Sequence, residues 1–153
     1  MVVYSIIFMT RKFNQEAYDK YDNKCKVATI EYLGKKGFYP ISDIDIEYYK
    51  KYDLEMVNDQ GMIIKIENEL RGQFKKIKEN YNSFHIPVRK KNTECDFYFI
   101  WSPDYDEIGI IKKKVFLKYM ENVKSTVCQK NKAHEWIEDF IDIPKNEIIF
   151  RKV

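Results

Sequence analysis

The feature that most constrains the fold is a pair of alternating apolar runs within residues 52–71, joined by Asn58-Asp59-Gln60-Gly61. Turn-forming residues between two such runs predict a β-hairpin, because successive side chains of a strand point to opposite faces. A five-residue loop over 58–62 places Asp53 opposite Glu67. A four-residue loop would shift the register by one residue and separate these two carboxylates. Any site built on the hairpin therefore depends on its register.

In the five-residue register the hairpin has one apolar face, formed by Leu54, Met56, Ile64 and Ile66. The opposite face gathers charged residues, namely Asp53, Glu55, Lys65, Glu67 and Glu69. Carboxylates this close repel each other unless they are solvated or share a divalent cation, and Mg²⁺ prefers oxygen ligands of this kind. Two interpretations are open: a metal site, or a strand face that simply meets water.

The pattern resembles the PD-(D/E)xK nuclease superfamily, in which an Asp begins one strand, the next strand ends in Glu-x-Lys, and a helix follows. Asp53 and Glu67 match the Asp and the Glu of that motif. Glu69 stands where the family has its lysine, as in the Glu-x-Glu variant of some restriction endonucleases, and Tyr52 replaces the proline. Lys65, on the same expected face, is a candidate substitute for the missing lysine.

The resemblance implies a metal-dependent endonuclease that hydrolyses DNA phosphodiester bonds in restriction, junction resolution or phage DNA processing. Asp53, Glu67 and Glu69 would hold Mg²⁺ or Mn²⁺, and Lys65 would join them as the fourth catalytic residue. The alternative is a catalytically inactive nucleic-acid-binding or regulatory protein on a degenerate nuclease fold. The absence of a lysine at position 69 favours this alternative.

Four cations near the carboxylates are candidate DNA contacts: Arg71, Arg89, Lys90 and Lys91. Arginine and lysine neutralise backbone phosphates without reading the sequence. The order Ile86-Pro87-Val88-Arg89-Lys90, followed by an apolar run over 95–101, resembles phage-type members of the superfamily. The other interpretation of this basic run is a solvated loop.

A helix is predicted over residues 15–36 from apolar positions at helical spacing, with Gly37 just past its end. In the resembled superfamily a helix at this place often contributes an acidic residue. Glu16 and Glu31 are the two candidates, and both also fit as ordinary surface carboxylates.

The remaining pattern predicts an α/β protein with a mixed central β-sheet flanked by helices. The resemblance implies that this is a restriction-endonuclease-like core. The other expected strands are 2–9, 38–47, 95–101, 108–111 and 147–151, and the other expected helices are 70–81 and 131–141. Residues 115–121 fit either a strand or a short helix. A single domain of 153 residues is expected, with the nuclease-like core at about 15–117 and a C-terminal extension at 118–153.

The composition limits which partners and cofactors the chain is expected to bind. The net charge is only +3, so DNA binding has to come from local clusters of cations. Three scattered cysteines argue against a disulfide framework or a zinc module. No long apolar segment or signal sequence is evident, so we expect a cytoplasmic protein (in the host, if viral) without a membrane partner. A homodimer would suit the cutting of two DNA strands.

Overall fold

The computed structural model describes residues 24–41, 54–88, 90, 93–131 and 134–153. The predicted strand at 2–9 lies outside these residues. So do residues 42–47 of the predicted strand 38–47, and five single residues named above: Glu16, Tyr52, Asp53, Arg89 and Lys91.

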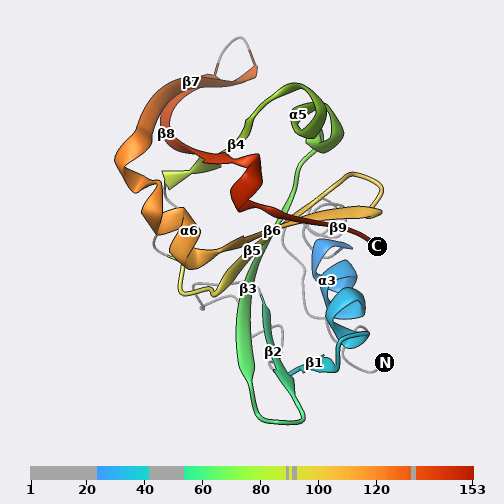
Figure 1. The fold of residues 1–153 in the computed structure, drawn as a ribbon. Coiled ribbons are helices and arrows are strands. Elements are labelled where there is room, and N and C mark those ends of the chain that lie inside the picture. The colour runs from blue at the N-terminus through green and yellow to red at the C-terminus, as the bar shows by residue number, and fades with distance from the viewer. Residues whose placement is uncertain (1–23, 42–53, 89, 91–92, 132–133) are drawn as a thin grey trace.

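The described chain has an α/β fold built on a mixed six-stranded sheet, as predicted (Figure 1). Three α-helices are described: α3 (Lys24–Gly34), α5 (Phe74–Asn80) and α6 (Lys113–Lys118). The strands of the central sheet, in spatial order, are β1 (Phe38–Pro40), β2 (Leu54–Asn58), β3 (Ile63–Leu70), β5 (Phe97–Trp101), β6 (Glu107–Lys112) and β9 (Ile149–Lys152). A second sheet has the order β4 (Ser83–Pro87), β8 (His134–Pro144) and β7 (Val123–Asn131). Short 3-10 turns lie at Met120–Asn122 and Lys145–Glu147.

The β2–β3 hairpin has the five-residue loop that the sequence predicts. The Asn58 side chain accepts a hydrogen bond from the backbone N–H of Met62 at 2.9 Å, which closes the loop locally. Gly61 adopts a φ of 80°, a conformation that glycine takes without steric cost. The strands then pair Val57 with Ile63, so the predicted register is confirmed.

Strand β3 is the centre of the mixed sheet. It runs antiparallel to β2 and parallel to β5, and the parallel connection passes through α5 and β4. Strand β5 is the aromatic run Phe97–Trp101, and it pairs antiparallel with β6. Because side chains alternate along β3 and β5, these strands contribute to the packing on both faces of the sheet.

Helix α3 covers one face of the sheet (Figure 1). The core on this side contains Leu54, Met56, Ile66, Phe99, Trp101 and Ile108 under Cys25, Ile30 and Leu33 of the helix. A polar connection holds α3 in place: the Trp101 indole donates to Thr29 Oγ1 at 3.0 Å, and the Thr29 hydroxyl donates to Asn68 Oδ1 at 2.6 Å. Even-numbered residues of β3, such as Ile66 and Asn68, therefore point towards α3.

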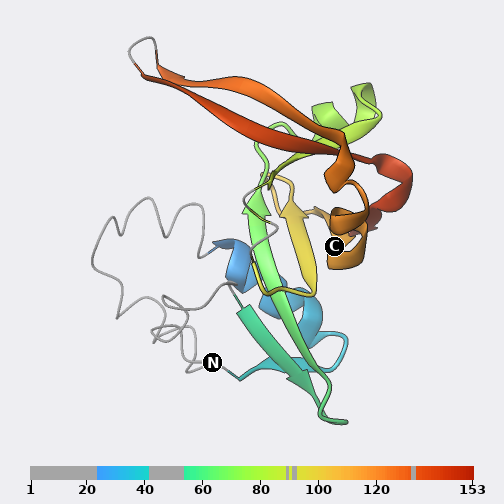
Figure 2. The ribbon, with the colours of Figure 1, turned by 90° about the vertical axis from the view of Figure 1, so that its left-hand side faces the viewer.

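The other face is covered by α5, α6 and the second sheet, and the β7–β8 hairpin arches away from the body (Figure 2). Phe74 of α5 is fully buried here and makes edge-type contacts with Phe84 and Phe150. Ile141 and Ile143 of β8 are also buried in this cluster. The second sheet therefore forms part of the main hydrophobic core.

The predicted helix over 131–141 is wrong, because residues 134–144 form strand β8, paired with both β4 and β7. Its apolar positions fit a helical period, yet Ile141 and Ile143 alternate with Asp142, as a strand requires. The pairing partner in β4 lies more than 50 residues earlier in the chain.

Other elements differ in their bounds. The helix predicted over 15–36 ends at Gly34, and Gly37 follows with a φ of 88°. The helix predicted over 70–81 begins at Phe74, because β3 continues to Leu70. Residues 115–121, which the sequence fits to either a strand or a short helix, are mostly helical and belong to α6 and the 3-10 turn after it. None of the helices described has the length and apolar character needed to cross a membrane.

Candidate functional site

The two described carboxylates of the predicted motif, Glu67 and Glu69, lie on the same face of β3. This is the face away from α3, since Asn68 between them reaches Thr29 of that helix. The parallel register pairs Glu67 with Tyr98 and Glu69 with Ile100, both of which belong to the core under the second sheet. The two carboxylates therefore lie beside a hydrophobic cluster.

Glu67 forms an ion pair with Lys90. The lysine Nζ lies 2.8 Å from Glu67 Oε1, and the two side chains are only 16% and 13% exposed, respectively. The segment after β4 thus returns to the acidic face of β3 and brings a cation to the key carboxylate. Sequence reasoning placed Lys90 near the site as a DNA contact, and the structure adds its direct contact with Glu67.

A cluster of hydrogen bonds holds the backbone around Lys90. The Lys113 ammonium donates to the carbonyl oxygens of Thr93 at 2.7 Å and Lys90 at 3.3 Å. It also donates to the Tyr98 hydroxyl at 3.0 Å, and that hydroxyl donates in turn to the Lys90 carbonyl. The Thr93 hydroxyl adds a further hydrogen bond to the Lys90 carbonyl at 2.7 Å. We refer to Thr93, Tyr98 and Lys113 as the Lys90 clamp.

Burial sets the protonation behaviour of this cluster. It raises the pKa of the Tyr98 hydroxyl far above its ordinary value, so the group keeps the proton that it donates. It also raises the pKa of the neighbouring Cys95 thiol. Burial lowers the pKa of Lys113, and the negative charge of Glu67 is among the influences that oppose this shift.

Glu69 has a cationic partner of its own. Arg71 donates to Glu69 Oε1 through Nη2 at 2.8 Å and through Nε at 3.2 Å. A further hydrogen bond at 2.9 Å connects Arg71 Nη2 to the carbonyl oxygen of His85 in β4. With only 17% of its side chain exposed, Arg71 is held between β3 and β4.

Lys65 lies on the same face of β3 as Glu67, two residues earlier, and is paired with Glu55 across the hairpin. Its backbone marks the start of the parallel pairing with β5. The Lys65 N–H donates to Asp96 Oδ2 at 2.9 Å, and the Asp96 N–H donates to the Lys65 carbonyl at 2.7 Å.

The structure does not bring every candidate to this face. Glu31 is exposed on α3, which covers the opposite face of the sheet. Asp53, which the sequence predicts to lie opposite Glu67, is outside the residues that the structure describes. Among the residues that the structure describes, no three His, Cys, Asp or Glu side chains gather in a way that could hold a metal ion.

Sequence reasoning missed the Lys90 clamp. Lys113 stood in the run Lys112-Lys113-Lys114, which resembles a solvated basic patch. Its role arises because α6 begins at Lys113 and directs the side chain towards the loop. One signal was present: the hydroxyl of Tyr98 lies within an otherwise apolar strand, and a buried hydroxyl requires a hydrogen-bond partner.

No protein-family model, curated protein or solved structure matches this chain. The resemblance to the nuclease superfamily therefore stays a prediction that rests on the residues of the motif.

Proposed function

We propose that this protein is a metal-dependent endonuclease that hydrolyses DNA phosphodiester bonds. One observation carries the proposal: Glu67 and Glu69 lie on one face of β3, the face on which Lys90 and Arg71 also reach them. Helix α5 and the parallel strand β5 follow. This order of strand, acidic motif and helix is what the resemblance to the PD-(D/E)xK superfamily implies.

The donor chemistry on this face suits Mg²⁺ or Mn²⁺. Glu67 and Glu69 offer the hard carboxylate oxygens that such ions prefer, and Asp53 would complete the set. A bound ion would lower the pKa of a coordinated water and offset the charge that develops on the phosphate. In this structure Lys90 and Arg71 balance the charges of the two glutamates, so a bound ion would compete with these side chains for the carboxylate oxygens.

Other residues of the chain would bind the DNA phosphates and position the attacking water. Lys90, held beside Glu67, would contact the phosphate next to the bond that breaks, and its clamp would fix its position. Arg71, Arg89 and Lys91 would contact neighbouring phosphates. Lys65 would assist in orienting or deprotonating the water. Two copies acting together would suit cleavage of both strands, in the cytoplasm of the cell that contains the DNA.

The test is a cleavage assay on supercoiled, linear and branched DNA with Mg²⁺ or Mn²⁺. We compare Glu67→Gln with Glu79→Gln, which removes an exposed carboxylate on α5. Glu67→Gln should slow cleavage by about 100-fold or more, because it removes a ligand that acts in the transition state. Glu79→Gln should cut like the wild type, and EDTA should abolish cleavage. Undiminished cleavage by folded Glu67→Gln would refute the assignment.

A second candidate is a nucleic-acid-binding protein without catalysis on the same fold. Two observations favour it: Glu69 stands where the family has lysine, and both glutamates are already paired with cations. This candidate predicts a gel shift of DNA that persists in EDTA and yields no cleaved product. The nuclease predicts product that depends on metal.

A further inference from the structure

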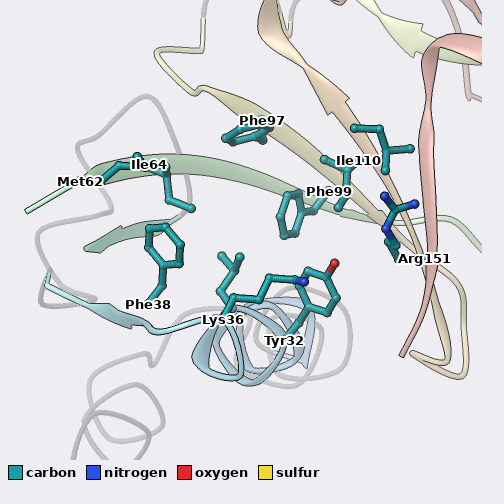
Figure 3. Close-up of a pocket in the computed structure, with 11 residues that line it drawn as sticks. Tyr32, Lys36, Phe38, Met62, Ile64, Phe97, Phe99, Ile110 and Arg151 are labelled. Atoms are coloured by element: carbon teal, nitrogen blue, oxygen red, sulfur yellow. The ribbon is translucent and has the colours of Figure 1, made fainter. Parts of the chain in front are cut away.

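A pocket of about 330 Å³ opens on the face of the central sheet that α3 covers (Figure 3). It lies between the end of α3 and the strands β1, β3, β5, β6 and β9. Its volume is within the range of ordinary small-molecule sites.

The wall of the pocket is apolar and well supported. Phe99 and Leu33 are almost fully buried in the core between α3 and the sheet. Phe38, Ile64, Phe97 and Ile110 pack against that core and remain half-buried. Tyr32 is fixed by edge-on contacts with Phe99 and Trp101. The walls therefore have a defined shape.

Two cations complete the lining, and no described residue that lines the pocket is acidic. Lys36 and Arg151 are both exposed, and neither forms an ion pair with a carboxylate in the described part of the chain. The Lys36 ammonium lies 5.1 Å from the centre of the Tyr32 ring. In the view of Figure 3, the polar ends of Lys36, Tyr32 and Arg151 gather at one side of the pocket.

The opposite side of the pocket is apolar, with Phe38, Met62 and Ile64 drawn away from the cations in Figure 3. One end therefore offers an ammonium, a guanidinium and a phenol, while the other offers only apolar side chains. Guanidinium groups bind carboxylates through paired hydrogen bonds, and an apolar wall favours an apolar body. The lining is complementary to a molecule with one anionic end.

We propose that this pocket binds a small carboxylate carried on an aliphatic or aromatic body. The carboxylate would lie between Lys36 and Arg151, and the body would extend towards Phe38 and Ile64. A medium-chain saturated carboxylate is a suitable probe, because its body is apolar and its single charge is at one end.

The proposal is independent of the nuclease assignment. The pocket uses Ile64 of β3 and Phe97 and Phe99 of β5, which lie on the face opposite Glu67. The outcome of the DNA cleavage assay, positive or negative, therefore does not affect this proposal.

The test is isothermal titration calorimetry of the full chain with dodecanoate below its micellar concentration, with dodecanol as the uncharged analogue. Lys36→Glu and Arg151→Glu reverse the two charges at exposed positions, so the fold should persist, which circular dichroism checks. Lys35→Glu and Lys152→Glu are matched controls, since these exposed neighbours do not line the pocket.

We expect dodecanoate to bind with micromolar affinity and each pocket reversal to weaken binding about tenfold or more, the effect of losing one charged contact. The two control reversals should stay within about twofold of the wild type. Three results would overturn the proposal. Dodecanol could bind as tightly as dodecanoate, or all four variants could lose the same affinity for dodecanoate. The third is that no binding is detected at about 1 mM dodecanoate.

Two other occupants would also overturn it. An oligothymidylate that binds more tightly than dodecanoate, with affinity lost in Lys36→Glu, would identify a stacking platform for single-stranded DNA. A monomer–dimer equilibrium that both pocket reversals abolish, without dodecanoate binding, would identify an interface between two copies.

Discussion

Replacing Lys90 with methionine tests the central ion pair of the candidate site. Glu67 would keep a carboxylate that is 13% exposed and would lose the ammonium 2.8 Å away. Exposed pairs contribute about 0–1 kcal/mol, whereas a buried charge left without its partner costs about 3–5 kcal/mol. Because both side chains retain some contact with water, we expect the free energy of unfolding to fall by about 2 kcal/mol. For a chain of this length, that lowers Tm by about 4–8 °C.

The measurement is urea or thermal unfolding in a double-mutant cycle with Glu67→Gln, in buffer free of divalent ions. The double variant should regain much of the lost stability, because the side chain at position 67 is then neutral and no longer needs the ammonium beside it. Lys118→Met is the control, since Lys118 forms a similar pair with Glu147 at 3.2 Å but is 64% exposed. This control should lose less than about 1 kcal/mol.

Divalent cations extend the same experiment. If Glu67 belongs to a metal site, Lys90→Met removes a competing cation, so Mg²⁺ should stabilise this variant more than the wild type. Mg²⁺ at ten times its dissociation constant would add about 1.4 kcal/mol. A Lys90→Met variant as stable as the wild type, or one no less stable than Lys118→Met, would refute the argument from burial.

Three further predictions concern other positions. Hydrogen bonds from Ser102 and then Lys75 lower the pKa of Asp106 below 3.8. Its charge therefore stabilises the fold above the unfolded-state pKa, and this contribution is lost as the pH falls through the lower folded-state value. The stability gap between the wild type and Asp106→Asn should accordingly be constant near pH 6 and close towards about pH 2, as measured by urea unfolding. Burial raises the pKa of the Cys95 thiol above 9.0, so iodoacetamide at pH 8 should label Cys95 only in denaturant, with peptide mass spectrometry as the readout. Gly61→Ala should cost about 1 kcal/mol in urea unfolding, because φ is 80° there, whereas Gly72→Ala should be neutral within about 0.5 kcal/mol.

The local part of the fold was readable from the sequence. The register of the β2–β3 hairpin follows from the turn chemistry of Asn58 and Gly61 and from period-two alternation, all within 20 residues. Strand β5 was equally clear, because a run of aromatic and β-branched residues favours a core strand. These features depend on interactions between neighbours in the chain.

The errors and omissions involve partners far apart in sequence. Residues 134–144 form a strand because β4 and β7 are available for pairing, and no short window reveals such partners. The contact between Lys90 and Glu67 spans 23 residues, and the bond from Lys113 to the Lys90 carbonyl spans another 23. Period-two alternation predicted that Lys65, Glu67 and Glu69 share one strand face, but no local pattern predicts which cation reaches which carboxylate.

The pairing of β9 with β6 has a consequence during protein synthesis. Residues 113–148 separate the two strands, so β6 emerges from the ribosome well before its neighbour. At about 5–20 residues per second, the outer edge of β6 stays bare for roughly 2–7 s. This edge carries Ile108, Ile110 and Ile111, and an unpaired apolar strand readily recruits another chain. Two nascent chains can therefore pair through this edge before β9 covers it, and a product that stops before Ile149 should accumulate as insoluble protein.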